Sequence, residues 1–221
     1  MVLSRSGRSL GEAVFGPVAR VLVRLGVSAD AVTVVATALT ITAAVTLLPA
    51  GHLTAGALTV GLLVVADNLD GQIARQTGTA SDWGAFLDAT MDRLADAAIF
   101  GALAFWAVFH VPGIQGTITA AAAVACVALA QTVSYAKARA EAQGFTANIG
   151  LAERADRLVV VLVATLGVGS GLPAWVLGGA LVLVAAACAV TVAQRMVTVR
   201  RQWVARAGAP GESAPGEGQP S

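Results

Sequence analysis

Charged residues are scarce in this sequence. Only 12% of its 221 residues are Asp, Glu, Lys or Arg, whereas 57% are hydrophobic and the mean hydropathy is +0.76. Soluble domains usually carry about 25% charged residues. The shortage excludes an ordinary water-soluble domain and indicates a membrane protein.

Cysteine is also rare, with Cys126 and Cys188 as its two occurrences. Each lies inside an apolar run, and neither has a partner at a spacing typical of metal ligands. A disulfide framework and a cysteine-based metal site are therefore excluded. We expect both residues to be small apolar packing positions.

The apolar residues gather in six runs, and several reach about 20 residues once flanking small residues are counted, which is the length needed to cross a bilayer as a helix. The sequence therefore predicts an all-α integral membrane protein with six transmembrane helices in one domain, residues 31–207. The runs are 31–49, 53–66, 85–111, 118–133, 158–168 and 175–192.

The two ends of the chain differ from this domain. Residues 1–30 include a stretch with Pro17, Arg20 and Arg24 among Val and Leu, which is typical of an amphipathic helix on a membrane surface. A short connector helix is the alternative. Residues 208–221 are rich in Gly, Pro, Ser and Glu, so we expect a disordered cytoplasmic tail.

Basic residues are missing from three predicted turns, around residues 49–52, 110–116 and 169–173. In a chain that crosses six times, these turns share one side of the membrane. All 14 Lys and Arg residues then lie on the other side, which the positive-inside rule makes cytoplasmic. The acids divide in the same way. We therefore predict a plasma-membrane protein whose termini and active site face the cytoplasm.

A group of acids begins where the second predicted span ends. Charged residues at the ends of membrane spans are costly and usually functional. Asp67, Asp70, Gly71 and Ala74 fall on one face of an ideal helix. Two carboxylates thus share a surface with two residues that are too small to obstruct a ligand.

The next helix repeats the pattern, because Gly84, Asp88 and Asp92 recur at every fourth position. Four carboxylates brought together would repel one another unless a cation lies between them. With no His or Cys nearby, oxygen ligands favour Mg²⁺, Mn²⁺ or Ca²⁺ over zinc. The alternative is that the acids only form interfacial salt bridges with Arg75 and Arg93, but the acids outnumber these arginines.

Several nearby charges fall outside this pattern. Asp82 is expected to cap the N-terminus of its helix, and Asp96 is not needed for the metal pattern. Arg157, Arg200 and Arg201 are attributed to the general excess of basic residues on the cytoplasmic side.

The acidic segment has the spacing Asp67-x2-Asp70-Gly71-x2-Ala74-Arg75-x8-Gly84-x3-Asp88-x3-Asp92. This spacing resembles the signature of the CDP-alcohol phosphotransferase family at all eight of its positions. The resemblance implies six transmembrane helices, a homodimer and a polar cavity open to the cytoplasm. It also implies a reaction in which CDP-diacylglycerol (CDP-DAG) donates its phosphatidyl group to an alcohol and CMP leaves.

The resemblance further implies a role for each signature residue. Asp92 would be the general base. The ligands of one or two Mg²⁺ or Mn²⁺ ions would be Asp67, Asp70, Asp88 and Asp92. The residues against the nucleotide would be Gly71, Ala74 and Arg75, with Asp30 and Thr33 expected near the cytidine. The chain departs from the family at Ala29, where relatives commonly have proline.

A second set of polar residues resembles the acceptor side of the actinobacterial phosphatidylinositol phosphate synthases, a branch of this family. The set is Ser134, Lys137, Arg139, Arg154 and Arg195. Ser134 and Lys137 are one helical turn apart, and converging cations suit a phosphate dianion. Arg139 faces away from Lys137 on an ideal helix, although a bend at the helix end would bring it inward. The resemblance implies inositol 1-phosphate as acceptor.

Two alternatives remain open at this stage. A phosphatidylglycerophosphate synthase would share the signature and use glycerol 3-phosphate. A cation-coupled transporter would also carry carboxylates near a membrane cavity, but nearer the mid-membrane. The partners expected are CDP-DAG, inositol 1-phosphate, membrane lipids and a second copy of the chain, and no nucleic acid.

Overall fold

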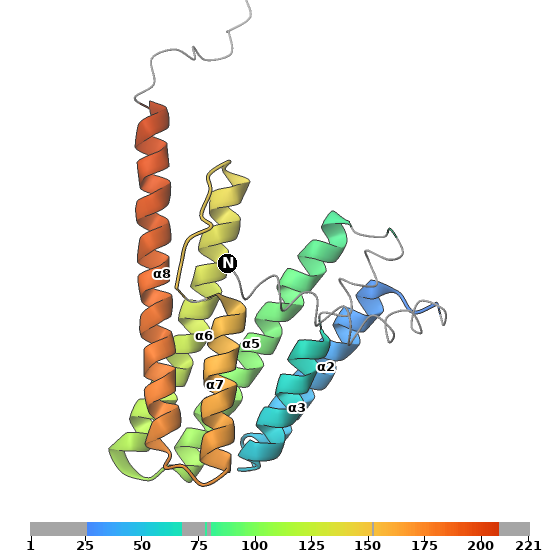
Figure 1. The fold of residues 1–221 in the computed structure, drawn as a ribbon, viewed down its shortest axis with the longest axis vertical. Helices are drawn as coiled ribbons and strands as arrows, with labels where there is room; N and C mark the ends of the chain where they lie inside the picture. The colour runs from blue at the N-terminus through green and yellow to red at the C-terminus, as the bar shows by residue number, and fades with distance from the viewer. Residues whose placement is uncertain (1–25, 68–77, 79–80, 152, 208–221) are drawn as a thin grey trace, which may run out of the picture.

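The computed structural model describes residues 26–67, 78, 81–151 and 153–207, and this part of the chain contains helices and no strands (Figure 1). The helices are α2 (Ala29–Leu47), α3 (Leu53–Ala66), α5 (Asp82–His110), α6 (Gly113–Ala142), α7 (Arg154–Gly169) and α8 (Trp175–Ala207). Each predicted apolar run falls within one of them, apart from a few residues at the run ends. The all-α prediction is confirmed.

The helices of the bundle fall into two groups by length. In the described part of the chain, α2, α5, α6 and α8 are long and apolar enough to cross a membrane. The 14 residues of α3 and the 16 of α7 span only about 21–24 Å at 1.5 Å per residue, whereas the hydrocarbon core is about 30 Å thick. Six complete crossings therefore stay a prediction. The proposed surface helix and the tail fall largely or wholly in residues 1–25 and 208–221, outside the described residues.

The six helices of the described residues close into a ring in the order α2, α3, α7, α8, α6 and α5, each packing against its two neighbours. Small residues allow the close approaches, as is common between membrane helices. A Cβ added at Gly178 on α8 would lie 2.6 Å from the Thr119 hydroxyl on α6, and one at Gly169 would lie 2.5 Å from the Thr54 nitrogen. Phe100 is fully buried within this ring.

Many large apolar side chains point out of the bundle. Leu62, Phe109 and Leu183 are each at least 64% exposed, which suits a surface in contact with lipid. Threonines on α2 satisfy their hydroxyls within the helix, as with Thr40 donating to the Ala36 carbonyl at 2.9 Å. Such internal bonds matter where no water is present to hydrogen-bond polar groups.

The three uncharged turns lie together at one end of the bundle (Figure 1). They join α2 to α3, α5 to α6 and α7 to α8. The opposite end carries the linker between α6 and α7 and the starts of α2, α5 and α7. The three turns thus share one end of the bundle, as a common side of the membrane requires, and their placement on one side of a membrane stays a prediction.

Serine hydroxyls cap two of the three helices that start at this opposite end, α2 and α5. Ser28 accepts a bond from the Ala31 amide at 3.2 Å, and Ser81 accepts one from the Gly84 amide at 3.1 Å. The prediction that Asp82 caps its helix was wrong by one position. Ser81 is the cap because its extended backbone turns the hydroxyl onto the free amides.

The linker between α6 and α7, described over residues 143–151 and 153, runs along the C-terminal half of α8 (Figure 1). The Leu151 amide donates to the Thr191 hydroxyl at 3.1 Å, and Gln202 accepts a bond from the Thr146 amide at 2.9 Å. Gly150 has a φ of +151°, and an added Cβ would meet the Thr191 methyl at 2.4 Å. The linker is therefore fixed by α8 just before Arg154, the first residue of α7.

Candidate active site

Three carboxylates meet near the linker end of the bundle. Asp67 follows the last residue of α3, and Asp88 and Asp92 lie one turn apart on α5. One oxygen from each of the three lies within 4.8 Å of the others. Asp67 and Asp92 are mostly buried, and Asp88 is exposed. The structure thus brings together three of the four acids predicted as metal ligands.

The donor set fits a divalent cation. It consists of carboxylate oxygens alone, which suit Mg²⁺ or Mn²⁺ better than zinc. Three negative charges this close repel one another unless cations lie among them. The remaining signature residues predicted around the metal and nucleotide lie outside the described residues: Asp70, Gly71, Ala74 and Arg75.

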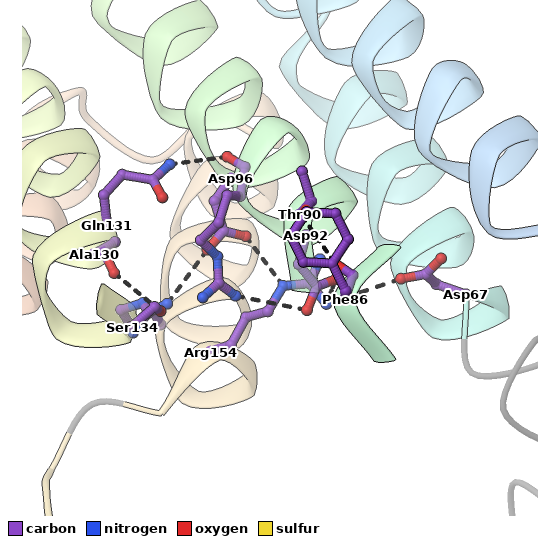
Figure 2. Close-up of polar contacts among 11 residues, drawn as sticks. Asp67, Phe86, Thr90, Asp92, Asp96, Ala130, Gln131, Ser134 and Arg154 are labelled. Carbon is purple, nitrogen blue, oxygen red and sulfur yellow. Dashed lines mark hydrogen bonds and ion pairs between the residues drawn. The ribbon is translucent and has the colours of Figure 1, made fainter. Parts of the chain in front are cut away.

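Arg154 extends from the start of α7 to the edge of this cluster (Figure 2). Its Nη1 lies 2.8 Å from Asp92 Oδ1 and 4.0 Å from Asp67 Oδ2. On its inner side, Nε donates to Asp96 Oδ1 at 3.2 Å. Arg93 adds a second guanidinium, 3.6 Å from Asp92 Oδ2. Arg154 therefore connects α7 to carboxylates on both α3 and α5.

Asp96 and Arg157 form an ion pair that sequence reasoning missed. Arg157 Nη2 donates to Asp96 Oδ2 at 3.3 Å, and both side chains are only 2% exposed. The attribution of Arg157 to the general cytoplasmic excess of basic residues was wrong, because this side chain is enclosed by the bundle. A signal was present, since Asp96 continues the every-fourth-residue spacing of Asp88 and Asp92.

The other predicted acceptor residues have separate contacts. Ser134 donates to the Ala130 carbonyl within α6 at 3.2 Å. It lies one turn beyond Gln131, whose amide donates to the Arg93 carbonyl on α5 at 2.9 Å. This bond places Ser134 near the level of the carboxylates along the bundle, in agreement with the close-up view (Figure 2).

Lys137 and Arg139 lie further along α6, toward its end. The Lys137 ammonium is 3.9 Å from Glu141, and both side chains are about half exposed. Arg139 is exposed. Neither is brought against Arg154 by the contacts described for it.

Arg195 on α8 is nearly buried, and its guanidinium joins two other elements. Nε donates to the Ile149 carbonyl of the linker at 3.0 Å, and Nη1 donates to the Val133 carbonyl of α6. These contacts hold the linker between α6 and α8. Arg195 thus supports the linker that leads to Arg154 at the start of α7.

The residues predicted for the cytidine, Asp30 and Thr33, lie at the start of α2, beside the start of α5. Asp30 Oδ2 accepts a bond from the Trp83 indole at 3.0 Å. An added Cβ at Gly84 would be 3.9 Å from Asp30 Oδ1, so Asp30 lies beside the signature glycine. Thr33 is buried and donates to the Ala29 carbonyl at 3.2 Å.

Comparison with known proteins decides the family. Residues 27–151, more than half of the chain, match the sequence model of the CDP-alcohol phosphatidyltransferases. The chain belongs to that family. This membership confirms the enzyme class that the eight-residue signature predicted, and it gives no support to a transporter.

Similar proteins share most of the chain. The phosphatidylinositol phosphate synthase of Corynebacterium glutamicum is 38% identical over 205 residues, which cover 93% of this chain and 92% of that protein. The synthase of the same name from Mycobacteroides abscessus is 44% identical over 184 residues, 83% and 82% of the two chains. The Streptomyces avermitilis synthase is 42% identical over 207 residues, which cover 91% of this chain and 84% of that protein.

Solved structures of the Mycobacterium tuberculosis phosphatidylinositol phosphate synthase have the same fold. The structure with CDP-DAG bound matches with a TM-score of 0.79 and 38% identity, covering 85% of this chain and 94% of that one. The complex with manganese and citrate matches with a TM-score of 0.80 and 37% identity, covering 93% of this chain and 96% of that one. The bound manganese of that relative agrees with the oxygen donor set found here.

Proposed function

We propose that this protein transfers the phosphatidyl group of CDP-DAG to inositol 1-phosphate, giving phosphatidylinositol phosphate and CMP. One observation carries the proposal: Arg154 Nη1 lies 2.8 Å from Asp92 Oδ1. A cation suited to an acceptor phosphate thus lies beside the carboxylate suited to deprotonate the acceptor hydroxyl. The names of relatives that cover most of the chain support this acceptor.

The carboxylates of Asp67, Asp88 and Asp92 would hold Mg²⁺ or Mn²⁺, together with Asp70 from the signature. A divalent ion there would neutralise charge on the donor diphosphate and on the CMP leaving group. The protein's contribution is to fix these oxygens from two helices. Asp30 and Thr33, at the adjoining start of α2, are proposed to contact the cytidine, with Gly71, Ala74 and Arg75 against the nucleotide.

Asp92 is proposed as the general base. The acceptor oxygen attacks the phosphorus of the phosphatidyl group, its proton passes to the Asp92 carboxylate, and the bond from phosphorus to the CMP oxygen breaks. Base catalysis of this kind contributes about 10²–10⁴ in rate. Arg154 and Arg93 contact opposite oxygens of Asp92 and so restrain the orientation of its carboxylate.

The acceptor phosphate is proposed to bind the Nη edge of Arg154. A guanidinium offers forked hydrogen bonds that match phosphate oxygens. Arg154 is 23% exposed, so part of this side chain is open to a ligand. The residues proposed to complete the phosphate site are Ser134, Lys137, Arg139 and Arg195.

The test is an acceptor screen with purified protein, CDP-DAG and Mg²⁺ or Mn²⁺, read out as CMP release. We expect kcat/KM to be highest with inositol 1-phosphate and far lower with free inositol, which leaves the cations without a counter-charge. A clear preference for glycerol 3-phosphate would instead assign the protein to the phosphatidylglycerophosphate branch, with the same base and metal ligands.

The protein is further proposed to be a plasma-membrane homodimer with six crossings, residues 31–207, whose active site and termini face the cytoplasm. Residues 1–30 would lie on the membrane surface, and residues 208–221 would form a cytoplasmic tail. The grouping of the three uncharged turns at one end of the bundle supports this orientation (Figure 1). The charged site lies toward the other end.

A further inference from the structure

We infer that Asp96 is a positioning residue, which holds the guanidinium of Arg154 in the orientation that presents its Nη edge to the acceptor phosphate. The inference rests on the proposed function, because it concerns the same acceptor site. Asp96 lies one turn beyond Asp92 on α5, outside the family signature, and its carboxylate is almost completely buried.

Both carboxylate oxygens of Asp96 are occupied by guanidinium groups of α7. Oδ1 accepts from Arg154 Nε at 3.2 Å, and Oδ2 accepts from Arg157 Nη2 at 3.3 Å. The two arginines are three residues apart and therefore share one face of their helix. Asp96 thus fastens the first turn of α7 to the middle of α5.

Charge and burial divide the roles of the two arginines. Arg157 is as buried as Asp96, at 2% exposure each, and a buried charge needs such a partner. The carboxylate is therefore already compensated by Arg157. Arg154, at 23% exposure, is not needed to neutralise Asp96, and its Nη1 pairs with Asp92 in the carboxylate cluster.

The atom of Arg154 that contacts Asp96 explains the positioning. The guanidinium is planar and rigid, so a bond at Nε fixes the direction of both Nη atoms. With Nε held by Asp96, Nη1 reaches Asp92 at 2.8 Å (Figure 2). Without this bond, Arg154 would keep only its Nη1 contacts with Asp92 and Asp67, and the plane of the guanidinium would be free to turn about them.

Two variants separate positioning from simple charge compensation. Asp96→Glu keeps the negative charge that Arg157 requires but moves the carboxylate by one methylene, whereas Asp96→Asn removes the charge. Asp156→Asn, an exposed acid two residues beyond Arg154, is the matched control. We would measure KM for donor and acceptor, kcat, and the rise in melting temperature that inositol 1-phosphate causes in detergent.

We expect Asp96→Glu to melt close to the wild type, to raise the acceptor KM at least about tenfold, and to lose most of the stabilisation by inositol 1-phosphate. Its donor KM should stay within about threefold, and the control should behave as wild type. Asp96→Asn should show the same acceptor defect or fail to fold, in which case Asp96→Glu decides.

A normal acceptor KM and a normal thermal shift in Asp96→Glu would overturn the inference. So would a parallel loss of donor binding, acceptor binding and stability, which indicates a purely structural role. The proposed function fails separately, in the wild type. If the wild type uses glycerol 3-phosphate, a raised KM for that phosphate in Asp96→Glu still supports positioning. If the wild type prefers unphosphorylated inositol, both proposals are wrong.

Discussion

Arg154 and Asp92 touch through Nη1 and Oδ1 at 2.8 Å, although 62 positions separate them in the sequence and they lie on different helices. The contact joins the two halves of the proposed chemistry, which are holding the acceptor phosphate and removing the acceptor proton. Because one guanidinium also reaches Asp67 and Asp96, substitutions around it should have separable effects.

The role of Asp92 as base predicts that a variant loses turnover but still binds the donor. Asp92→Asn keeps the size of the side chain but cannot accept the hydroxyl proton, so kcat should fall by about 10²–10⁴ or more. Binding of CDP-DAG, measured by its effect on melting temperature in the presence of Mg²⁺, should persist. Near-normal CMP release by this variant would remove Asp92 from the mechanism.

The role of Asp67 and Asp88 as metal ligands predicts a different defect. Asp67→Asn or Asp88→Asn should weaken the stabilisation that Mg²⁺ or Mn²⁺ gives to the purified protein, and with it the metal-dependent binding of donor. Asp82→Asn, an exposed acid at the start of the same helix as Asp88, is the control. Unchanged metal titrations in both ligand variants would contradict the assignment.

The sequence predicted the helices and the acidic cluster because both depend on local pattern. Apolar runs gave the helix positions, and the four-residue spacing placed Asp88 and Asp92 on one helical face. The spacing of Asp96 marks that residue alone, and its contact with Arg157 could not be predicted in the same way. It depends on how α5 packs against α7, and nothing in the spacing of Arg157 distinguishes a buried arginine from the many arginines at cytoplasmic helix ends.

Arg195 shows a second limit of the sequence. Its type and position suggested a phosphate ligand, and that role stays a proposal. The contacts found for it are with the carbonyls of Ile149 and Val133, and which carbonyls a guanidinium meets depends on the path of the linker. That path is fixed by Gly150 and Thr191, which sequence reasoning did not pair.

The grouping of uncharged turns predicts the membrane orientation. In a background without Cys126 and Cys188, single cysteines at Ala50 and Ser170 should react with a membrane-impermeant thiol reagent in intact cells. A cysteine at Gln143, on the opposite end of the bundle, should react only after the cells are permeabilised. Labelling of the Gln143 position in intact cells, with none at Ala50, would reverse the topology.

The forked contacts of Arg154 predict that charge alone does not suffice at this position. Arg154→Ala should cost about 1.5–3 kcal/mol for a hydrogen bond to a charged group, which corresponds to an increase of about 10–150-fold in acceptor KM. Arg154→Lys should recover only part of this loss, because lysine lacks the planar fork.

The comparison variants for Arg154 are Lys137→Ala and Arg200→Ala. Lys137 is about half exposed and pairs with Glu141, so its removal should raise the acceptor KM less. Arg200 is an exposed arginine on α8, and its removal should leave the acceptor KM unchanged. Equal effects of all three substitutions would show that general positive charge, and not Arg154 itself, attracts the acceptor.

The linker before α7 predicts that a single methyl group at Gly150 disturbs the active site. Gly150→Ala would place a Cβ 2.4 Å from the Thr191 methyl at a φ of +151°, a strain of about 1–3 kcal/mol. The melting temperature should fall. The acceptor KM should rise, because α7 begins with Arg154 only four residues after Gly150. Adding Thr191→Ser removes the methyl but keeps the hydroxyl that binds the Leu151 amide, so part of the loss should be recovered. Gly101→Ala, on α5 where a Cβ meets nothing within 4 Å, should not lower the melting temperature, since alanine favours a helix more than glycine does. The same result for Gly150→Ala would show that α8 does not fix the linker.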